Sequence, residues 1–234
     1  MNVLITRAAE QLAETVNIFS SHGLFPYCMP IIQSVALEAP EFKYDSYDYC
    51  ILTSPTAVKF FAPHKIVAKK YVAVGTATAK AICELLKVPE DCIFTPNSAY
   101  IGEIENFFTC INITGKKIVA PGALERIKDI GDLFRAGGAY FDAPALYETV
   151  AALYNKKEIE SVVNKYCIKA VTFFSPSAVS AFFDQAALPD DIITAAIGKT
   201  TADSLTMRGR TPVCGEEQTA ESLALTLKQI EKKR

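Results

Sequence analysis

The chain has few of the residues that metal ions and nucleic acids select. It holds only two histidines, and its seven cysteines are scattered, odd in number and without a CxxC pair. A zinc site is therefore not expected. Scattered cysteines of this kind are typical of a reducing compartment, where they pack as buried small hydrophobic side chains. The net charge of −2 over 234 residues provides no basic field for nucleic acid.

Long apolar runs and nucleotide motifs are missing as well. No run approaches the roughly 20 residues that a membrane span requires. The first strand is not followed by a GxGxxG or P-loop pattern, which disfavours nucleotide binding. The apolar stretch after Met1 is short and has no basic lead-in, so no signal peptide is expected. We therefore expect a cytoplasmic protein that contacts neither membranes nor nucleic acid.

What the sequence does contain is an internal repeat. Half of its residues are hydrophobic, and its length allows two small domains with cores of their own. A strand, a Ser-Pro turn and a helix occur at 49–61 and again at 171–183. A strand, a Gly-Thr turn and a helix follow at 72–79 and again at 195–202. Two linked motifs repeated in one order indicate a duplicated array of strands and helices.

The other elements repeat in the same order on either side of residue 115. The strand at 3–6 matches 117–120, and the proline-bearing extended segments at 26–37 and 141–150 occupy equivalent places. Proline cannot donate to a sheet, so Pro-bearing segments favour an edge or a crossover over a central strand. Alternating strands and helices predict parallel sheets with helices on both faces.

Each polar turn of the repeat follows a strand, and ligands of such sheets bind beyond the carboxyl ends of the strands. If two rims face each other, the turns line a cleft. Turns that open a helix present unpaired backbone N–H groups, which bind carboxylate or phosphate. Ordinary helix capping is the competing interpretation of each residue. The candidate binding residues are Thr6, Arg7, Thr53, Ser54, Gly75, Thr76, Thr78, Gly122, Ser175, Ser177, Gly198, Lys199, Thr200 and Thr201.

Taken together and in order, these motifs resemble the uroporphyrinogen-III synthase family over nearly the full length. The segments that carry the resemblance are VLITR at 3–7, TSPTAV at 53–58, VGTATA at 74–79, LYETV at 146–150, FFSPSA at 173–178 and AAIGKTTA at 195–202. The segment 121–126 looks like the family's glycine turn with an arginine four residues on, which adds Arg126 to the candidates. Pro121 stands where the family often has Arg or Cys.

The resemblance implies two flavodoxin-like parallel-sheet α/β domains joined by a two-stranded linker, with the chain crossing between the domains twice. The implied map is 1–34 with 150–234 for one domain, 36–148 for the other, and linkers near 32–38 and 145–151. The repeat alone predicts two sequential domains cut near residue 115 instead. Two thin connections imply a hinge.

By the same resemblance, the activity is the cofactor-free cyclisation of hydroxymethylbilane to uroporphyrinogen III, with inversion of ring D and loss of water. This small molecule is the implied partner, and we expect a monomer without a metal. Tyr147 is the candidate acid, and Arg7, Arg126 and Lys199 are candidate partners of substrate carboxylates. A crossover-strand aromatic and solvated surface cations are the competing interpretations. His22 and His64 are assigned no role.

Two other functional classes stay open at this point. A non-catalytic two-domain protein that binds a small polyanion would share the hinge and the donor-rich turns. A nucleotide-using α/β enzyme would share the fold, but the missing phosphate motif disfavours it. An assay with hydroxymethylbilane separates the first class from the synthase, because a binder would leave the ratio of type I to type III product unchanged.

Overall fold

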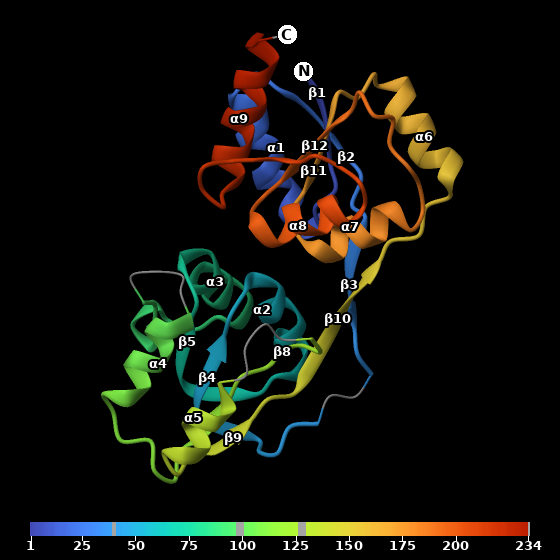
Figure 1. Ribbon diagram of the computed structural model, residues 1–234. Coiled ribbons are helices and arrows are strands. Elements are labelled where there is room, and N and C mark those ends of the chain that lie inside the picture. Colours follow the sequence, from blue (N-terminus) through green and yellow to red (C-terminus); the bar gives the residue numbers. More distant parts are fainter. Residues whose placement is uncertain (39–40, 97–100, 126–129, 234) are drawn as a thin grey trace. The chain divides into compact units, whose positions relative to one another are not determined.

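The structure, a computed structural model, describes residues 1–38, 41–96, 101–125 and 130–233. Contacts within the chain divide it into two compact units. Unit 1 comprises Met1–Gln33 and Val150–Arg234, and unit 2 comprises Ser34–Thr149. Each unit contains a parallel sheet with helices packed on both faces (Figure 1). The predicted α/β fold with parallel sheets is therefore confirmed.

The sheet of unit 1 has the strand order β13-β12-β11-β1-β2, and all of its neighbouring strands are parallel. Its strands are β1 (Asn2–Ile5), β2 (Phe25–Cys28), β11 (Ala170–Phe173), β12 (Ile193–Ala196) and β13 (Val213–Cys214). β2 lies at the edge, where the missing N–H of Pro26 costs the sheet no hydrogen bond.

Alternate side chains of β1 enter two separate cores of unit 1. Leu4 lies in a core with residues of α6 (Lys156–Lys165), α7 (Pro176–Phe183) and α8 (Lys199–Met207). Val3 and Ile5 lie in a second core with residues of α1 (Leu12–Ser21) and α9 (Ala220–Lys233). A short 3-10 turn, η1 (Ala9–Gln11), precedes α1. The strand is thus buried on both faces, as parallel sheets require.

The sheet of unit 2 has the order β6-β5-β4-β7-β9 and is also parallel throughout. Its strands are β4 (Ser46–Leu52), β5 (Val67–Ala73), β6 (Ile93–Phe94), β7 (Lys117–Val119) and β9 (Tyr140–Asp142). One face packs on α2 (Pro55–Phe61), α3 (Thr76–Ala81) and the π-helical turn η3 (Ile82–Leu86); the other packs on α4 (Ile101–Thr109) and α5 (Gly131–Ala136). Unit 2 also contains the 3-10 turns η2 (Ala62–His64) and η4 (Glu90–Cys92).

A third, small sheet contains the two segments through which the chain passes from one unit to the other. Its order is β3 (Ile32–Ala36), β10 (Ala145–Ala151) and β8 (Gly122–Ala123). Leu37 N donates to Leu146 O, and Ala152 N donates to Ile31 O, each at 2.9 Å. Because the later residue of one segment pairs with the earlier residue of the other, β3 and β10 are antiparallel.

All seven cysteines are unpaired, but most of them are not buried. Only Cys50, in the middle of β4, lies in a core. The expectation of buried cysteines is wrong for the four exposed ones, Cys28, Cys110, Cys167 and Cys214. These four lie at or just beyond the ends of helices and strands, where the chain reaches the surface.

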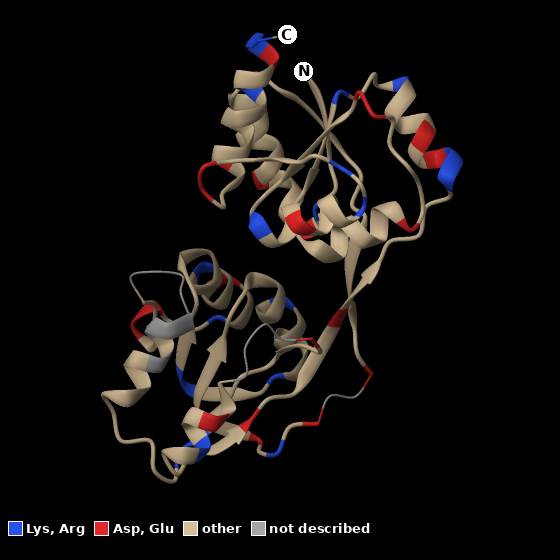
Figure 2. Cartoon of the chain, viewed as in Figure 1, with Lys and Arg blue, Asp and Glu red and all other residues tan. Residues whose placement is uncertain are grey.

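Charged residues of both signs are interspersed along the helices and loops of both units (Figure 2). This distribution accords with the small net charge of the chain. Within the described ranges, no helix has both the length and the apolar character needed to cross a membrane.

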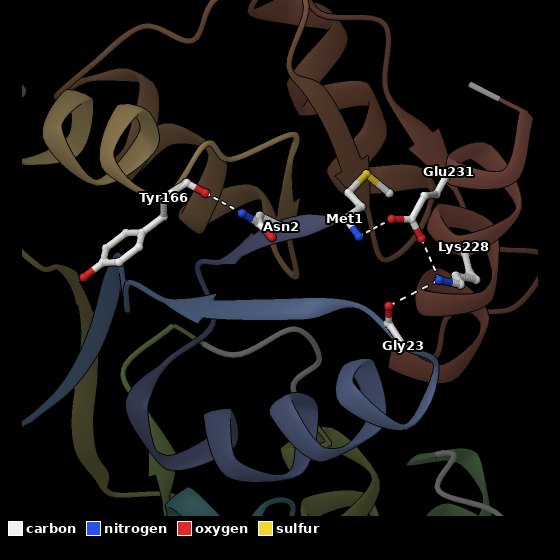
Figure 3. Close-up of polar contacts among 6 residues, drawn as sticks. All are labelled: Met1, Asn2, Gly23, Tyr166, Lys228 and Glu231. Carbon is white, nitrogen blue, oxygen red and sulfur yellow. Dashed lines mark hydrogen bonds and ion pairs between the residues drawn. The ribbon is translucent and has the colours of Figure 1, made fainter.

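Polar contacts join the two ends of the chain within unit 1 (Figure 3). The Met1 ammonium donates to the Glu231 carboxylate, which also accepts from Lys228 Nζ at 2.7 Å. Lys228 Nζ also reaches the carbonyl oxygen of Gly23 at 3.3 Å. The hydrogen bond from Lys228, followed by that from the ammonium, lowers the pKa of Glu231.

This arrangement predicts a pH-dependent contribution of Glu231 to stability. Because its folded pKa is depressed, the contribution is present above the unfolded value of about 4.3 and is lost as pH falls through the folded value. The group is partly exposed, so we expect Glu231→Gln to lower Tm by only about 1–4 °C at neutral pH. Calorimetry should find no such difference once the pH lies well below the folded pKa. An equal Tm at neutral pH would contradict this assignment.

Candidate active site

The two Ser-Pro turns use most of their polar groups to start a helix. Ser54 Oγ accepts from Ala57 N at 3.1 Å at the start of α2, and Ser175 Oγ accepts from Ala178 N at 3.2 Å at the start of α7. The next residue in each turn is proline, which has no N–H. Among the amides of each turn, only that of the second helical residue, Thr56 or Ser177, therefore has no partner in the described part of the chain. The hydroxyls of Ser54 and Ser175 are helix caps.

Neighbouring polar side chains of these turns remain at the surface. Thr53 and Ser177 are exposed. Ser177 Oγ lies 2.9 Å from Ser175 Oγ, so it shares a hydrogen bond with the capping hydroxyl. Both side chains are therefore accessible to solvent.

The two Gly-Thr turns differ, because no side chain caps them. Gly75 precedes α3 and Gly198 precedes α8, and neither helix has a side-chain hydrogen bond at its N-cap. The first amides that bond within the chain are Ala79 N and Ala202 N, which donate to the two glycine carbonyls. Within the described part of the chain, three amides of each helix therefore have no partner. They belong to Thr76, Ala77 and Thr78 in α3, and to Lys199, Thr200 and Thr201 in α8.

A different constraint selects glycine at each of these two positions. Gly75 has φ +84°, a conformation that residues with a side chain rarely adopt. Gly198 is extended, but a Cβ there would lie 2.7 Å from the side-chain carbon Cδ of Gln218. A side chain at position 198 would therefore require the Gln218 side chain to move, and this neighbour was not predicted from the sequence.

The threonines of the candidate set divide into exposed and buried side chains. Thr76, Thr200 and the neighbouring Lys199 are exposed at the open ends of the two helices. Thr78 and Thr201 are almost fully buried, and Thr78 Oγ1 donates to Val74 O at 2.9 Å. The side chains of this second pair therefore belong to the packed interior, and the exposed residues of the two first turns are Thr76, Ala77, Lys199 and Thr200.

Thr6 and Gly122 have structural roles in this geometry. Thr6 is fully buried, and its Oγ1 donates to Thr172 O at 2.7 Å. Gly122 is buried in β8, and its amide donates to Pro144 O at 3.2 Å. The sequence pattern predicted donor turns at both places, but neighbouring strands already use these groups. Arg126, predicted to follow the glycine turn, lies outside the described residues.

Arg7 is half-buried in a pocket of about 490 Å³ at the carboxyl ends of β1, β11 and β12. Its Nε donates to Gln11 Oε1 and its Nη1 to Thr15 Oγ1, both at 2.9 Å. The guanidinium carbon lies 4.8 Å from the centre of the Phe174 ring, within the range of a cation–π contact. Burial lowers the pKa of Arg7. These contacts fix the side chain and leave three of its five N–H groups without a hydrogen bond inside the described chain.

Tyr147 lies on β10 in unit 2 and is 8% exposed. Its ring stacks on that of Phe60, with ring centres 4.8 Å apart and planes 20° from parallel. Its carbonyl accepts from Leu124 N at 2.8 Å. Its hydroxyl has no hydrogen-bond partner among the described residues, and these residues include no buried side-chain oxygen or nitrogen that lacks a partner. The hydroxyl of Tyr147 therefore reaches the protein surface.

Comparison with known proteins identifies the family to which this geometry belongs. The family model described as uroporphyrinogen-III synthase HemD matches residues 11–233. The chain belongs to the uroporphyrinogen-III synthase family. This membership assigns the chain to the lyases of porphyrin and heme biosynthesis, and it confirms the resemblance seen in the sequence motifs.

Two relatives of the uroporphyrinogen-III synthase family are similar over almost all of this chain. A protein of Archaeoglobus fulgidus, named as a candidate uroporphyrinogen-III synthase, is 27% identical over 97% of this chain and 98% of its own length. The porphyrin biosynthesis protein HemD of Ruminiclostridium josui is 25% identical over 97% of this chain. The chain spans about half the length of the second protein, since the match covers 48% of it.

Solved uroporphyrinogen-III synthase structures show the same fold. The enzyme from Helicobacter pylori aligns with a TM-score of 0.64 at 17% identity and covers 100% of this chain and 99% of that one. A mutant enzyme from Thermus thermophilus aligns with a TM-score of 0.52 at 15% identity over both full chains. At such low identity these two likenesses concern the fold alone.

Proposed function

We propose that the chain converts hydroxymethylbilane into uroporphyrinogen III. The hydroxyl of ring A takes a proton and leaves as water, which gives an electrophilic azafulvene. Ring D attacks it through its substituted position, and the resulting spiro intermediate fragments so that ring D closes inverted. The pyrrole nitrogens supply the electrons, so this chemistry needs no cofactor. The observation that carries the proposal is the family match over residues 11–233.

The main task of the protein in this reaction is to control conformation. The bilane also closes spontaneously, without inversion, to the type I isomer. A flexible chain must therefore be held so that the substituted carbon of ring D, rather than the unsubstituted one, meets the azafulvene. The acetate and propionate arms are the groups through which the protein can hold it.

The Gly-Thr turns are the favoured carboxylate sites. Together they carry six amides without a partner among the described residues, and four of these belong to the exposed residues Thr76, Ala77, Lys199 and Thr200. Each charge-assisted hydrogen bond contributes about 1.5–3 kcal/mol, and the helix dipole adds to the attraction. The Ser-Pro turns provide only one such amide each, so we assign them mainly to helix initiation. Lys199 and the three remaining N–H groups of Arg7 are further partners for the arms.

Tyr147 is the proposed general acid. Its hydroxyl is at the surface and is not used by another described residue, so it can donate to the departing hydroxyl of ring A. Because the pyrrole nitrogen already expels the hydroxyl, a weak acid is sufficient.

We also propose that the two units are flavodoxin-like domains linked by β3 and β10. The order β2-β1-β11-β12-β13 in unit 1 is the flavodoxin order 2-1-3-4-5. Unit 2 has the same order, β9-β7-β4-β5-β6, when β7 and β9 are matched to β1 and β2 through the sequence repeat. Unit 1 is then a discontinuous domain that contains both ends of the chain, and a cytoplasmic monomer remains the prediction for the whole protein.

The discontinuous domain predicts how fragments of the chain will fold. Residues 1–115 lack β7 and β9 of unit 2 and β11, β12 and β13 of unit 1, whereas residues 34–149 contain the entire sheet of unit 2. We expect residues 34–149 to melt cooperatively in calorimetry and residues 1–115 and 116–234 to show no cooperative transition. Two halves that each melt cooperatively would contradict this domain map.

A non-catalytic polyanion-binding protein would also use open helix N-termini. Incubation with hydroxymethylbilane followed by isomer analysis separates the two functions. A synthase enriches the type III isomer, whereas a binder leaves the spontaneous, type I closure as the source of product.

A further inference from the structure

The ring of Phe60 stacks on the side chain of Tyr147. Phe60 lies on α2, and both rings belong to the core between α2, α3 and the sheet of unit 2. The backbone of Tyr147 is held by β8, through Leu124 N and the pairing with Ala123. The stacked ring of Phe60 fixes the plane of the Tyr147 ring together with the other residues of this core.

The other two buried tyrosines in the described part of unit 2 are held differently. Tyr47 OH donates to the Asp142 carboxylate at 2.5 Å, and Tyr71 OH accepts from Ala68 N at 3.3 Å. Buried tyrosines usually find such a partner for the hydroxyl. Tyr147 has none among the described residues, so its orientation depends on packing and its hydroxyl stays available to a molecule from outside.

The sequence repeat shows that both members of the pair are peculiar to unit 2. The position equivalent to Phe60 in α7 is Ala181, and the position equivalent to Tyr147 in β3 is Gln33. Gln33 is exposed, so the corresponding place in unit 1 has no aromatic pair. An asymmetric substrate that loses a hydroxyl at one end needs its acid in one unit only.

We propose that Phe60 is a positioning residue that aims the hydroxyl of Tyr147 at the leaving group. The inference rests on the proposed function and deepens it. Phe60 itself transfers no proton. It restricts the Tyr147 ring to one plane, and this fixes the direction from which the Tyr147 hydroxyl donates its proton to the leaving group.

Removal of the stacking ring tests this role. Misplacing a reacting group by about 1 Å can cost up to about 100-fold in rate, so we expect Phe60→Leu to lower kcat for type III formation by about 10-fold or more. KM should change by less than about 2-fold, because the proposed carboxylate sites are the Gly-Thr turns and not Phe60. Phe60→Tyr keeps a ring at this place and should restore kcat.

A double variant shows whether Phe60 acts through the hydroxyl of Tyr147. In the Tyr147→Phe background the hydroxyl is absent, so Phe60→Leu should have little further effect, because residues that act as one unit are not additive. Independent effects that multiply in the double variant would overturn the proposal.

Phe94 provides a matched control within the same unit. It stacks on Phe107 with ring centres 4.0 Å apart and planes 19° from parallel, and it is 38% exposed. Phe94→Leu should leave kcat and the isomer ratio unchanged. If Phe60→Leu behaves like Phe94→Leu while Tyr147→Phe is impaired, the positioning role is wrong and the function stands. If the unsubstituted protein forms no type III isomer, the proposed function itself fails.

Discussion

Tyr147→Phe is expected to lower the rate of type III formation by about 10²–10⁴-fold, the usual contribution of a general acid. The substitution removes only the hydroxyl, and the ring can still stack on Phe60. Unreacted bilane should then close spontaneously, so the product shifts toward the type I isomer. The loss should be incomplete, because water can supply part of the proton transfer. Product analysis by chromatography after a timed incubation measures both quantities.

An unchanged fold is the control for this variant. Its Tm should stay close to that of the unsubstituted protein, because the hydroxyl makes no hydrogen bond to the described chain. If Tyr147→Phe keeps full turnover and an unchanged isomer ratio, Tyr147 is not the general acid. Catalysis would then depend only on how the turns position the substrate.

Proline at the first position of α3 or α8 is expected to weaken substrate binding strongly. Thr76→Pro and Lys199→Pro each remove from a Gly-Thr turn one amide that has no partner among the described residues. Loss of one charge-assisted hydrogen bond of about 1.5–3 kcal/mol corresponds to a rise in KM of roughly 10- to 100-fold. The helices should still form, because proline suits this position and already occupies it as Pro55 in α2 and Pro176 in α7.

Alanine at the same two positions separates the amide from the side chain. Thr76→Ala and Lys199→Ala keep the N–H, so their KM should rise far less than with proline; Lys199→Ala also measures the contribution of the charge. Steady-state kinetics with hydroxymethylbilane gives all four values. If the alanine variants are as impaired as the proline variants, the side chains bind the substrate and the backbone does not.

The sequence predicted the fold well where the local pattern and the nonlocal pairing agree. The repeated Ser-Pro and Gly-Thr turns do follow parallel strands, and Pro26 does mark an edge strand. The helix α6 was missed, although Asn155 and Glu158 form a capping box that the sequence displays. Strand order could not be obtained from local patterns, since it depends on pairings between residues more than 100 positions apart, such as Val3 with Ala170.

The candidate site was harder to predict than the fold. Ser and Thr after a strand can cap a helix or bind a ligand, and the same residue types serve both purposes. The structure separates them: the hydroxyls of Ser54, Ser175 and Thr6 have partners inside the chain, whereas the first amides of the Gly-Thr turns have none among the described residues. Phe60 could have been found from the sequence, because the equivalent position of the repeat holds Ala181.

Isomer analysis of the product formed from hydroxymethylbilane tests the central claim most directly. The unsubstituted protein is incubated with the bilane, the uroporphyrinogens are oxidised, and the type I and type III isomers are separated and compared with a protein-free sample. We predict that the type III isomer dominates in the presence of the protein, while the protein-free sample yields type I. A product ratio equal to that of the protein-free sample would contradict the synthase function and favour a protein that only binds the bilane.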